Sequence, residues 1–346
     1  MKEILLLRFS AMGDVAMLQP ILRQALAQYP DLRFRLLSRP AFAPFFAPID
    51  RLEFVGIDLE KDYQGLGGIW RLSKELQKGP KPLAIADMHN VLRTQVLGPL
   101  LSWSWGIPLA KMQKERGAKK KLAAPKAHKN IQYLRSHHLR YADVLAKLGF
   151  PIDLSAELAP PIFEGSTALA PFLAPQGPKL GVAPKARYAG KTYPLELMQQ
   201  SLEALLAACP NLQIYLFGGP SEGQEFSQWP IAQSKQLHIV AGQLPLSDEL
   251  ALMSQLTAFL AMDSSNMHMA AFFEKPIVSL WGASHPAFGF YPWRQPLEYA
   301  LLPDYEQFPM LPSSRNGSKM FKGYENAMAS ISPQQIVDKL LPLLQA

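Results

Sequence analysis

The chain contains a single cysteine, Cys209, among 346 residues. One thiol excludes an intramolecular disulfide and any metal site built from several cysteines, and it is typical of a reducing compartment. No apolar run approaches the roughly 20 residues that a membrane-spanning helix needs. The leucine-rich run near the N-terminus ends at Arg8 and is too short for a signal peptide, so we expect it to be a first strand. We therefore expect a cytoplasmic protein.

Loops of the kinds that bind phosphate or metal ions are also scarce. No segment fits the P-loop pattern, and the most glycine-rich stretch, residues 65–68, does not directly follow an expected strand. There is no paired aspartate or Asp-x-Asp run of the kind that holds a divalent cation. We therefore expect no metal ion and no cofactor.

The length and hydropathy pattern predict two domains. A chain of 346 residues exceeds the usual size of one core, and its 48% hydrophobic and 18% charged content is ordinary for a globular protein. Short apolar strands alternate with helical patterns on both sides of a proline-rich stretch at 151–178. We expect an α/β fold with two doubly wound parallel sheets. The expected domains are residues 1–165 and 166–330, and a C-terminal helix at 331–346 is left free to pack back on the first domain.

The elements that matter for function follow from this alternation. The expected strands cover residues 4–8, 33–37, 52–55 and 83–86 in the first half, and 180–183, 213–217, 237–240, 258–262 and 276–281 in the second. The expected helices include 69–76, 131–148, 194–208, 247–255 and 333–344. Residues 111–127 lack apolar periodicity and are expected to form a loop.

Positive charge is concentrated in one segment. The formal net charge is +7, and residues 111–147 contain eleven lysines and arginines against two acidic residues. Such a segment suits a phosphorylated substrate, an anionic membrane surface or nucleic acid, although a solvated loop and helix face is the commoner explanation. Without interleaved stacking aromatics or a recognisable reader motif, we do not expect nucleic acid as a partner.

Polar turns follow several expected strands. The apolar run 258–262 stops at Asp263, and Ser264 and Ser265 come directly before a short helical pattern that includes His268. The start of a helix has unpaired N–H groups and the positive end of a dipole, which attract phosphates. Simple capping of the helix by these residues is the alternative.

Other strand ends provide charges for the same chemistry. Ligands of open parallel sheets bind beyond the carboxyl ends of the strands. Cations after strand 180–183 and amides after strand 258–262 would therefore converge, as a nucleoside diphosphate leaving group requires. In the second half, Glu222 after strand 213–217 could accept hydrogen bonds from a ribose. In the first half, Asp14 beside Gly13 could act as a general base. The cations concerned are Lys185, Arg187 and Lys191.

The chain resembles the ADP-heptose:lipopolysaccharide heptosyltransferases of glycosyltransferase family 9 over nearly its whole length. Ser10-Ala11-Met12-Gly13-Asp14 and the residues up to Pro20 resemble the N-terminal motif of the family, and Lys191-Thr192-Tyr193-Pro194 is similar to its Lys-x-Trp-Pro. Asp263 to His268 resembles Asp-(Thr/Ser)-Gly-x-x-His, and Phe217 to Pro220 with Glu222 resembles the segment that contacts the nucleoside.

The resemblance implies a GT-B architecture of two facing Rossmann-like domains with an interdomain cleft. It implies an inverting, metal-independent transfer of a heptose or related sugar from a nucleoside-diphosphate donor, such as ADP-heptose, to a lipopolysaccharide inner-core acceptor at the cytoplasmic face of the inner membrane. Asp14 would be the catalytic base. The implied donor-binding residues are Lys191, Thr192, Glu222, Asp263, Ser264, Ser265 and His268. Further contacts with the donor phosphates are expected from Lys185, Arg187 and Gly13, and contacts with the phosphorylated glycolipid from Lys119, Lys120, Lys121, Arg93 and Arg140.

Two positions depart from the family pattern. Ser265 stands where the family has glycine, and Met267 stands where a small polar residue is common. These departures leave open a different donor sugar or a catalytically inactive relative that binds nucleotide sugars. A sugar-nucleotide epimerase of the same architecture is a further alternative.

Overall fold

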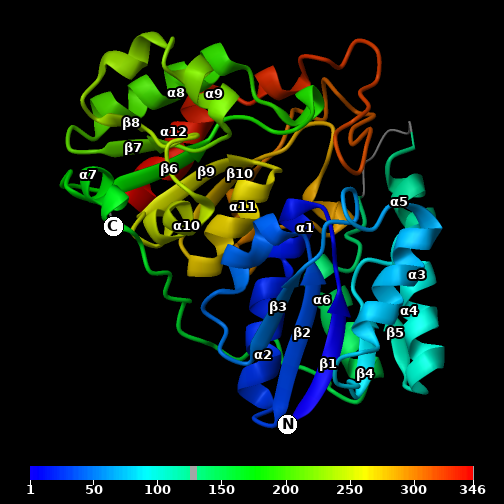
Figure 1. Ribbon diagram of the computed structural model, residues 1–346. Helices are drawn as coiled ribbons and strands as arrows, with labels where there is room; N and C mark the ends of the chain where they lie inside the picture. Colours follow the sequence, from blue (N-terminus) through cyan, green and yellow to red (C-terminus); the bar gives the residue numbers. More distant parts are fainter. Residues whose placement is uncertain (125–130, 346) are drawn as a thin grey trace. The chain divides into compact units, whose positions relative to one another are not determined.

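The computed structural model describes residues 1–124 and 131–345 of the chain. Lys126 and Lys129 of the basic segment lie outside these ranges. The chain divides into two compact units (Figure 1): unit 1 comprises Met1–Glu115 and His137–Ala159, and unit 2 comprises Arg116–Ser136 and Pro160–Ala346. Each unit contains its own parallel sheet, so the expected α/β fold with two parallel sheets is confirmed.

Unit 1 is built on a five-stranded parallel sheet of order β3-β2-β1-β4-β5. Its strands are β1 (Lys2–Leu7), β2 (Leu32–Ser38), β3 (Leu52–Gly56), β4 (Ala84–Asp87) and β5 (Leu109–Lys111). Its α-helices are α1 (Met12–Ala16), α2 (Leu18–Gln28), α3 (Gly65–Leu76), α4 (Leu92–Trp105) and α6 (His137–Lys147), and η1 (Pro40–Phe46) is a 3₁₀-helix. The side chains of Ile4 to Leu7 are fully buried, because helices cover both faces of a parallel sheet. The strand order reverses between β1 and β4, which makes the ends of these strands the switch point of the sheet.

Unit 2 contains a six-stranded parallel sheet of order β11-β10-β9-β6-β7-β8. The strands are β6 (Lys179–Ala183), β7 (Gln213–Leu216), β8 (Leu237–Ile239), β9 (Ala258–Met262), β10 (Ile277–Leu280) and β11 (Ala300–Leu301). The α-helices are α5 (Arg116–Leu122), α7 (Ala170–Leu173), α8 (Leu195–Ala208), α9 (Pro220–Phe226), α10 (Leu246–Ser254), α11 (Ser265–Ala270) and α12 (Pro333–Gln345). The short 3₁₀-helices are η2 (Thr167–Leu169), η3 (Ala189–Lys191), η4 (Pro230–Gln233), η5 (Ala271–Phe273), η6 (Pro286–Phe288), η7 (Leu297–Tyr299) and η8 (Ala327–Ser330). The switch point of this sheet lies between β6 and β9.

The C-terminal helix α12 belongs to the core of unit 2. Its apolar side chains Ile336, Val337, Leu340 and Leu344 are buried in the same cluster as residues of β6, β7 and α8. The helix packs against α8. From the sequence, packing of this helix against the first domain was left open as a possibility. In the structure its apolar face packs within unit 2.

Residues 111–127 were expected to form a loop, and for residues 116–122 this expectation is wrong. Residues 116–122 form α5, whose Leu122 is buried against Ala287 and Phe288. The ammonium of Lys119 lies 4.6 Å from the centre of the Phe290 ring. A lysine stands on the inner face of this short helix, so the apolar periodicity that would have revealed it is absent.

The contacts of this segment also give a grouping of residues that differs from the expected domains. Residues 131–136 were expected to begin the helix 131–148, but the helix starts only at His137. The amide of Leu134 donates to the carbonyl of Ala287, at 2.8 Å. The expected first domain, 1–165, is continuous in sequence, whereas residues 116–136 group with unit 2.

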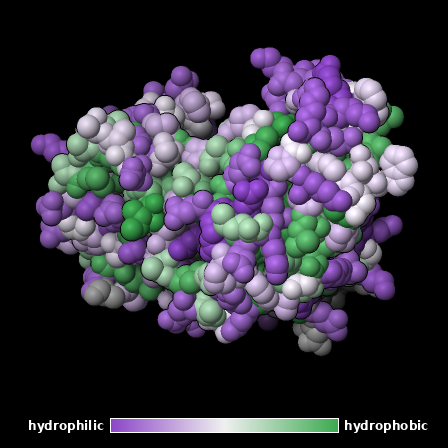
Figure 2. Space-filling view, turned by 60° about the horizontal axis from the view of Figure 1, so that its bottom comes forward, coloured by the Kyte–Doolittle hydropathy of each residue, from purple (hydrophilic) through white to green (hydrophobic). Residues whose placement is uncertain are grey.

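Polar and apolar residues are interspersed on the face of the molecule that Figure 2 displays. Within the described ranges, no helix combines the length and the apolarity required to cross a membrane.

Candidate functional site

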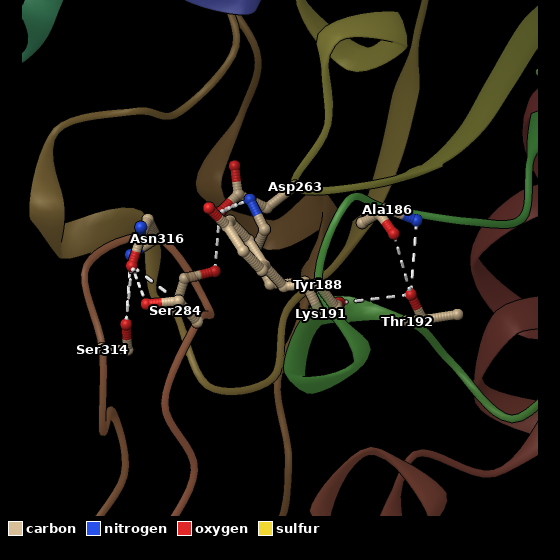
Figure 3. Close-up of polar contacts among 9 residues, drawn as sticks. Ala186, Tyr188, Lys191, Thr192, Asp263, Ser284, Ser314 and Asn316 are labelled. Carbon is tan, nitrogen blue, oxygen red and sulfur yellow. Dashed lines mark hydrogen bonds and ion pairs between the residues drawn. The ribbon is translucent and has the colours of Figure 1, made fainter. Parts of the chain in front are cut away.

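The switch point of unit 2 brings Lys191 and Asp263 together. Asp263 follows β9, and Lys191 ends the loop after β6, the neighbouring strand. Their Nζ and Oδ2 atoms are 3.1 Å apart, and the Ser284 hydroxyl donates to the same Oδ2 at 2.6 Å (Figure 3). The side chains of Lys191 and Asp263 are only 12% and 9% exposed, so water screens the pair weakly. An ammonium has three N–H donors, and this contact uses one of them.

Loops of small residues hold Lys191 in place. The carbonyl of Gly190 accepts a hydrogen bond from the amide of Ala283, at 2.7 Å. Gly317 has φ of +76°, and a Cβ there would lie 2.1 Å from Cγ of Lys191. Only glycine fits this position without moving the lysine. The hydroxyl of Ser314 donates to the side-chain oxygen of Asn316, which keeps this loop compact beside the ion pair.

The residues after Asp263 form the start of a short helix. Ser264 is the N-cap residue of α11, its side chain makes no capping hydrogen bond, and its buried Oγ has no hydrogen-bond partner among the described residues. Ser265 is the first residue of α11, and His268 is buried on the same helix. Met267 is fully buried, so the departure from a small polar residue at this position fills the core of unit 2.

The other expected donor-binding residues of unit 2 take part in local contacts. The hydroxyl of Thr192 lies 3.3 Å from the carbonyl of Tyr188 and thereby closes its own loop (Figure 3). The ammonium of Lys185 pairs with Glu225 at 2.6 Å, and the exposed Arg187 stacks on the ring of Tyr188. Glu222 accepts a hydrogen bond from the amide of Gly219 at 2.7 Å and so caps α9.

The switch point of unit 1 surrounds Asp14 with donors. Asp14 lies in α1, directly after β1, and its Oδ1 is 2.9 Å from the guanidinium of Arg8 and 3.6 Å from Nδ1 of His137. Tyr141, one turn after His137 on α6, donates to the backbone carbonyl of Asp14. Arg8 is itself fixed, because its Nη1 donates to the carbonyl of Met88 at 2.6 Å. These contacts hold the carboxylate in one orientation and leave it 23% exposed.

A neutral histidine stands beside this carboxylate site. His89 follows β4, its Nδ1 accepts from the amide of Phe9, and its Nε2 lies 3.4 Å from the hydroxyl of Ser10. Burial, together with the nearby charge of Arg8, lowers the pKa of His89 to about 2. The carboxylate of Asp87 fixes the turn by accepting from the amides of His89 and Asn90.

The five expected acceptor-binding cations fall into two groups. Lys119 and Arg140 are buried: Lys119 lies over Phe290, and Arg140 pairs with Glu115 at 2.5 Å. The other three are exposed: Arg93 on α4, and Lys120 and Lys121 on α5. Gly13 lies in the first turns of α1, where its carbonyl accepts from the amide of Met17.

Sequence reasoning missed the partners that orient the two carboxylates. Arg8 was treated as the end of a strand, and His137 and Ser284 were given no role. His89 was likewise given no role. Ser284 could not be found locally, because it reaches Asp263 from beyond the next strand.

Comparison with known proteins identifies the family. Residues 61–312, more than half of the chain, match the model of glycosyltransferase family 9 (heptosyltransferase). The chain belongs to glycosyltransferase family 9. It is 26% identical over 186 residues to lipopolysaccharide heptosyltransferase 2 of Escherichia coli K12, an alignment that covers 50% of this chain and 48% of that protein. The chain thus spans about half the length of the curated relatives it matches.

Solved structures share its fold. The glycosyltransferase of family 9 from Veillonella parvula superposes with a TM-score of 0.76 at 18% identity, covering 99% of this chain and 97% of that one. ADP-heptose lps heptosyltransferase II of E. coli gives a TM-score of 0.67 at 20% identity, with 100% and 99% covered. The family 9 chain therefore has a fold of the GT-B type, in which each domain is Rossmann-like.

Proposed function

We propose that this family 9 protein is an inverting glycosyltransferase that moves a heptose or related sugar from a nucleoside diphosphate, ADP in the first instance, to a phosphorylated glycolipid of the lipopolysaccharide inner core. The observation that carries the proposal is the Lys191–Asp263–Ser284 contact at the switch point of unit 2. It joins a cation that suits a diphosphate to a carboxylate that suits sugar hydroxyls, at the edge where open sheets bind ligands.

The leaving group defines the role of unit 2. As the bond between the anomeric carbon and the diphosphate breaks, its electron pair moves to the phosphate oxygen. Lys191 and the backbone amides at Ser264 and Ser265 stabilise that charge. Asp263 and His268 contact the sugar side of the donor, and Glu222 and Thr192 the nucleoside side. Lys185, Arg187 and Gly13 are secondary candidates for the phosphates.

Asp14 is the base that activates the acceptor hydroxyl. Its carboxylate takes the proton of the acceptor hydroxyl as the oxygen bonds to the anomeric carbon opposite the leaving diphosphate. Arg8 and His137 fix the carboxylate for this step. The exposed cations Arg93, Lys120 and Lys121 contact the phosphates of the glycolipid, with Lys119 and Arg140 supporting their segments. The protein works at the cytoplasmic face of the inner membrane, in peripheral contact with its anionic surface.

The decisive variant is Asp14→Asn, which keeps the size of the side chain and removes the base. We expect turnover of ADP-heptose with an inner-core acceptor to fall at least about a hundredfold, within the range that general base catalysis contributes. The affinity for ADP, measured by calorimetry, should stay unchanged. Asp31→Asn is the matched control, because Asp31 is exposed and adjoins the first residue of β2, at the opposite end of the sheet. Normal transfer by Asp14→Asn would show that the assigned base is wrong.

The alternatives are separated by omitting the acceptor. An epimerase converts a nucleotide sugar alone, whereas a transferase leaves it intact until an acceptor is added. Family membership favours transfer. Tight ADP binding without turnover on any inner-core acceptor would instead identify a binding protein, in line with Ser265 at the position of the family glycine.

A further inference from the structure

Helix α4 is apolar on both of its sides. Its inner side is packed: Thr94, Leu97, Gly98 and Leu101 are buried, and a Cβ at Gly98 would lie 3.3 Å from Leu109 of the sheet. Surface helices of soluble domains carry charged or polar residues on the opposite side. Here the outer side carries Leu92, 75% exposed, and Trp103, 87% exposed. Eleven residues are three helical turns, so these two side chains lie along one outer stripe.

The residues between them continue this stripe. Val96, Pro99 and Leu100 follow at helical spacing and are partly or fully accessible. The charged residue of the helix is Arg93. We call the side chains from Leu92 to Trp103 on this side the outer face of α4. An apolar face of this length beside the solvent indicates a partner.

The neighbouring helix extends the surface. In unit 1, α3 packs against α4 and runs alongside it (Figure 1). Leu66 and Trp70, one turn apart on α3, are both exposed. Lys74 holds its ammonium 5.7 Å from the ring of Trp70. The helix pair therefore presents two tryptophans, leucines and basic side chains, the combination that is enriched where proteins meet the polar surface of a bilayer.

The charged residues around α4 indicate which kind of partner this surface would bind. The segment between Asp87 and Glu115 contains no aspartate or glutamate, but it contains the basic residues Arg93, Lys111 and Lys114. On α3 the exposed Glu75 accompanies Arg71 and Lys74 and accepts a hydrogen bond from the hydroxyl of Tyr63, and Asp58, Glu60 and Asp62 precede the helix. Cations beside exposed tryptophan and leucine complement an anionic lipid surface, which holds basic side chains by charge and amphipathic rings by partial burial.

We propose that the outer face of α4, with Leu66 and Trp70 of α3 beside it, docks unit 1 on an anionic bilayer, and that Trp103 and Leu92 enter the headgroup region. This deepens the proposed function, on which it rests in one respect: a glycolipid acceptor is held in such a bilayer. It names the surface that meets the lipid.

Vesicle binding tests the proposal. The full chain is sedimented with vesicles of phosphatidylglycerol and phosphatidylethanolamine, and with phosphatidylcholine vesicles of equal size. We expect binding to the anionic vesicles that weakens with salt, and little binding to the neutral ones. The double variant Leu92→Ser/Trp103→Ser should bind the anionic vesicles at least about tenfold more weakly, as the loss of two exposed apolar side chains predicts.

The matched control is Ile162→Ser, because Ile162 is 83% exposed and lies in unit 2. It should bind as the wild type does. All variants change exposed residues, and equal melting temperatures will verify that they fold. Absence of vesicle binding by the wild type, or equal binding by the double variant, overturns the proposal. So does a dimer in light scattering that Trp103→Ser converts to monomer, since the face would then be covered by a second copy.

Failure of this inference is distinguishable from failure of the proposed function. ADP affinity and transfer to a delipidated, water-soluble acceptor do not involve the outer face of α4, and the double variant should retain both. A wild type that binds vesicles but neither ADP nor acceptor would overturn the proposed function alone.

Discussion

Asp263 is a buried carboxylate whose position depends on two partners. Lys191 and Ser284 approach the same oxygen, and the lysine and the aspartate are 72 residues apart in the chain. Breaking a buried pair leaves one charge without compensation, which costs far more than an exposed pair contributes. At the scale of single residues, the lysine stabilises Asp263, and we expect it to bind the donor phosphates as well.

Replacing Lys191 with methionine should weaken ADP binding and lower the stability of the fold. Loss of a charge-assisted hydrogen bond of about 1.5–3 kcal/mol lowers ADP affinity by about ten- to a hundredfold, and the melting temperature falls because Asp263 loses its cation. Calorimetry with ADP and thermal unfolding measure the two effects. Lys185→Met is the comparison variant, because Lys185 is the secondary candidate for the phosphates and pairs with Glu225 instead of Asp263. If Lys185→Met loses ADP binding and Lys191→Met keeps it, the phosphates belong to Lys185.

His89 should make the stability of the protein depend on pH. Its pKa is lowered from 6.5 to about 2, so between these values the unfolded chain binds a proton that the folded chain does not. The free energy of unfolding therefore rises with pH across this window and falls on acidification. At pH 5 the loss due to this residue is about 2 kcal/mol.

The comparison with His89→Gln isolates this contribution, because glutamine stays neutral. Melting temperatures of both proteins are measured from pH 7.5 to 5. We expect the wild type to lose more stability than the variant over this range, whatever their difference at pH 7.5. Parallel profiles would mean that His89 is protonated in the folded protein.

At the scale of elements, the loop between β11 and α12 shapes the site although it contains none of the expected site residues. Gly317 stands against the side chain of Lys191, and the amides of Ser313 and Ser314 donate to the carbonyl of Ala283. This stretch is irregular, and its sequence gave no periodic pattern to interpret. Its role depends on the close approach of backbone to lysine.

Gly317→Ala should therefore displace Lys191 and lower ADP affinity. Gly323→Ala is a close match, because both glycines have positive φ and only Gly317 has a neighbour within 4 Å of an added Cβ. The backbone strain of about 1–2 kcal/mol is common to both variants. We expect both to lose stability and Gly317→Ala alone to lose ADP affinity. Equal ADP affinity in the two variants would show that the loop does not position the lysine.

At the scale of the whole molecule, the expected donor-binding residues apart from Gly13 belong to unit 2, and the assigned base belongs to unit 1. Lys191, Thr192, Glu222 and the residues from Asp263 to His268 follow strands of one sheet. The donor is thus expected to be bound by one unit and the proton to be accepted by the other.

Hydrogen exchange can test this division. Addition of ADP should slow exchange most in residues 184–193 and 263–270 of unit 2, because the ligand engages amides at the ends of β6 and β9. Residues 9–16 around Asp14 should change less. Mass spectrometry of peptic fragments measures both regions in one experiment. Protection confined to residues 9–16 would place the nucleotide on the wrong unit.

The sequence by itself determined the two parallel sheets and the polar turns beyond their strands. Strands buried on both faces are continuous apolar runs, as 258–262 is, and the polar residue that stops such a run marks a ligand-binding edge. Motifs at these edges also indicated the family. Helix α5 was not predicted, because the buried position on its inner face is occupied by a lysine, Lys119, instead of an apolar residue.

Only the tertiary structure decided which polar residues meet. Strand order makes β6 and β9 neighbours and so joins Lys191 to Asp263. It also makes β1 and β4 neighbours and so sets the amide of Phe9 against His89. The packing of α6 brings His137 to Asp14. Contacts with η6 and its flanking residues group 116–124 and 131–136 with unit 2. These contacts join residues far apart in the chain, and local periodicity carries no information about such pairs.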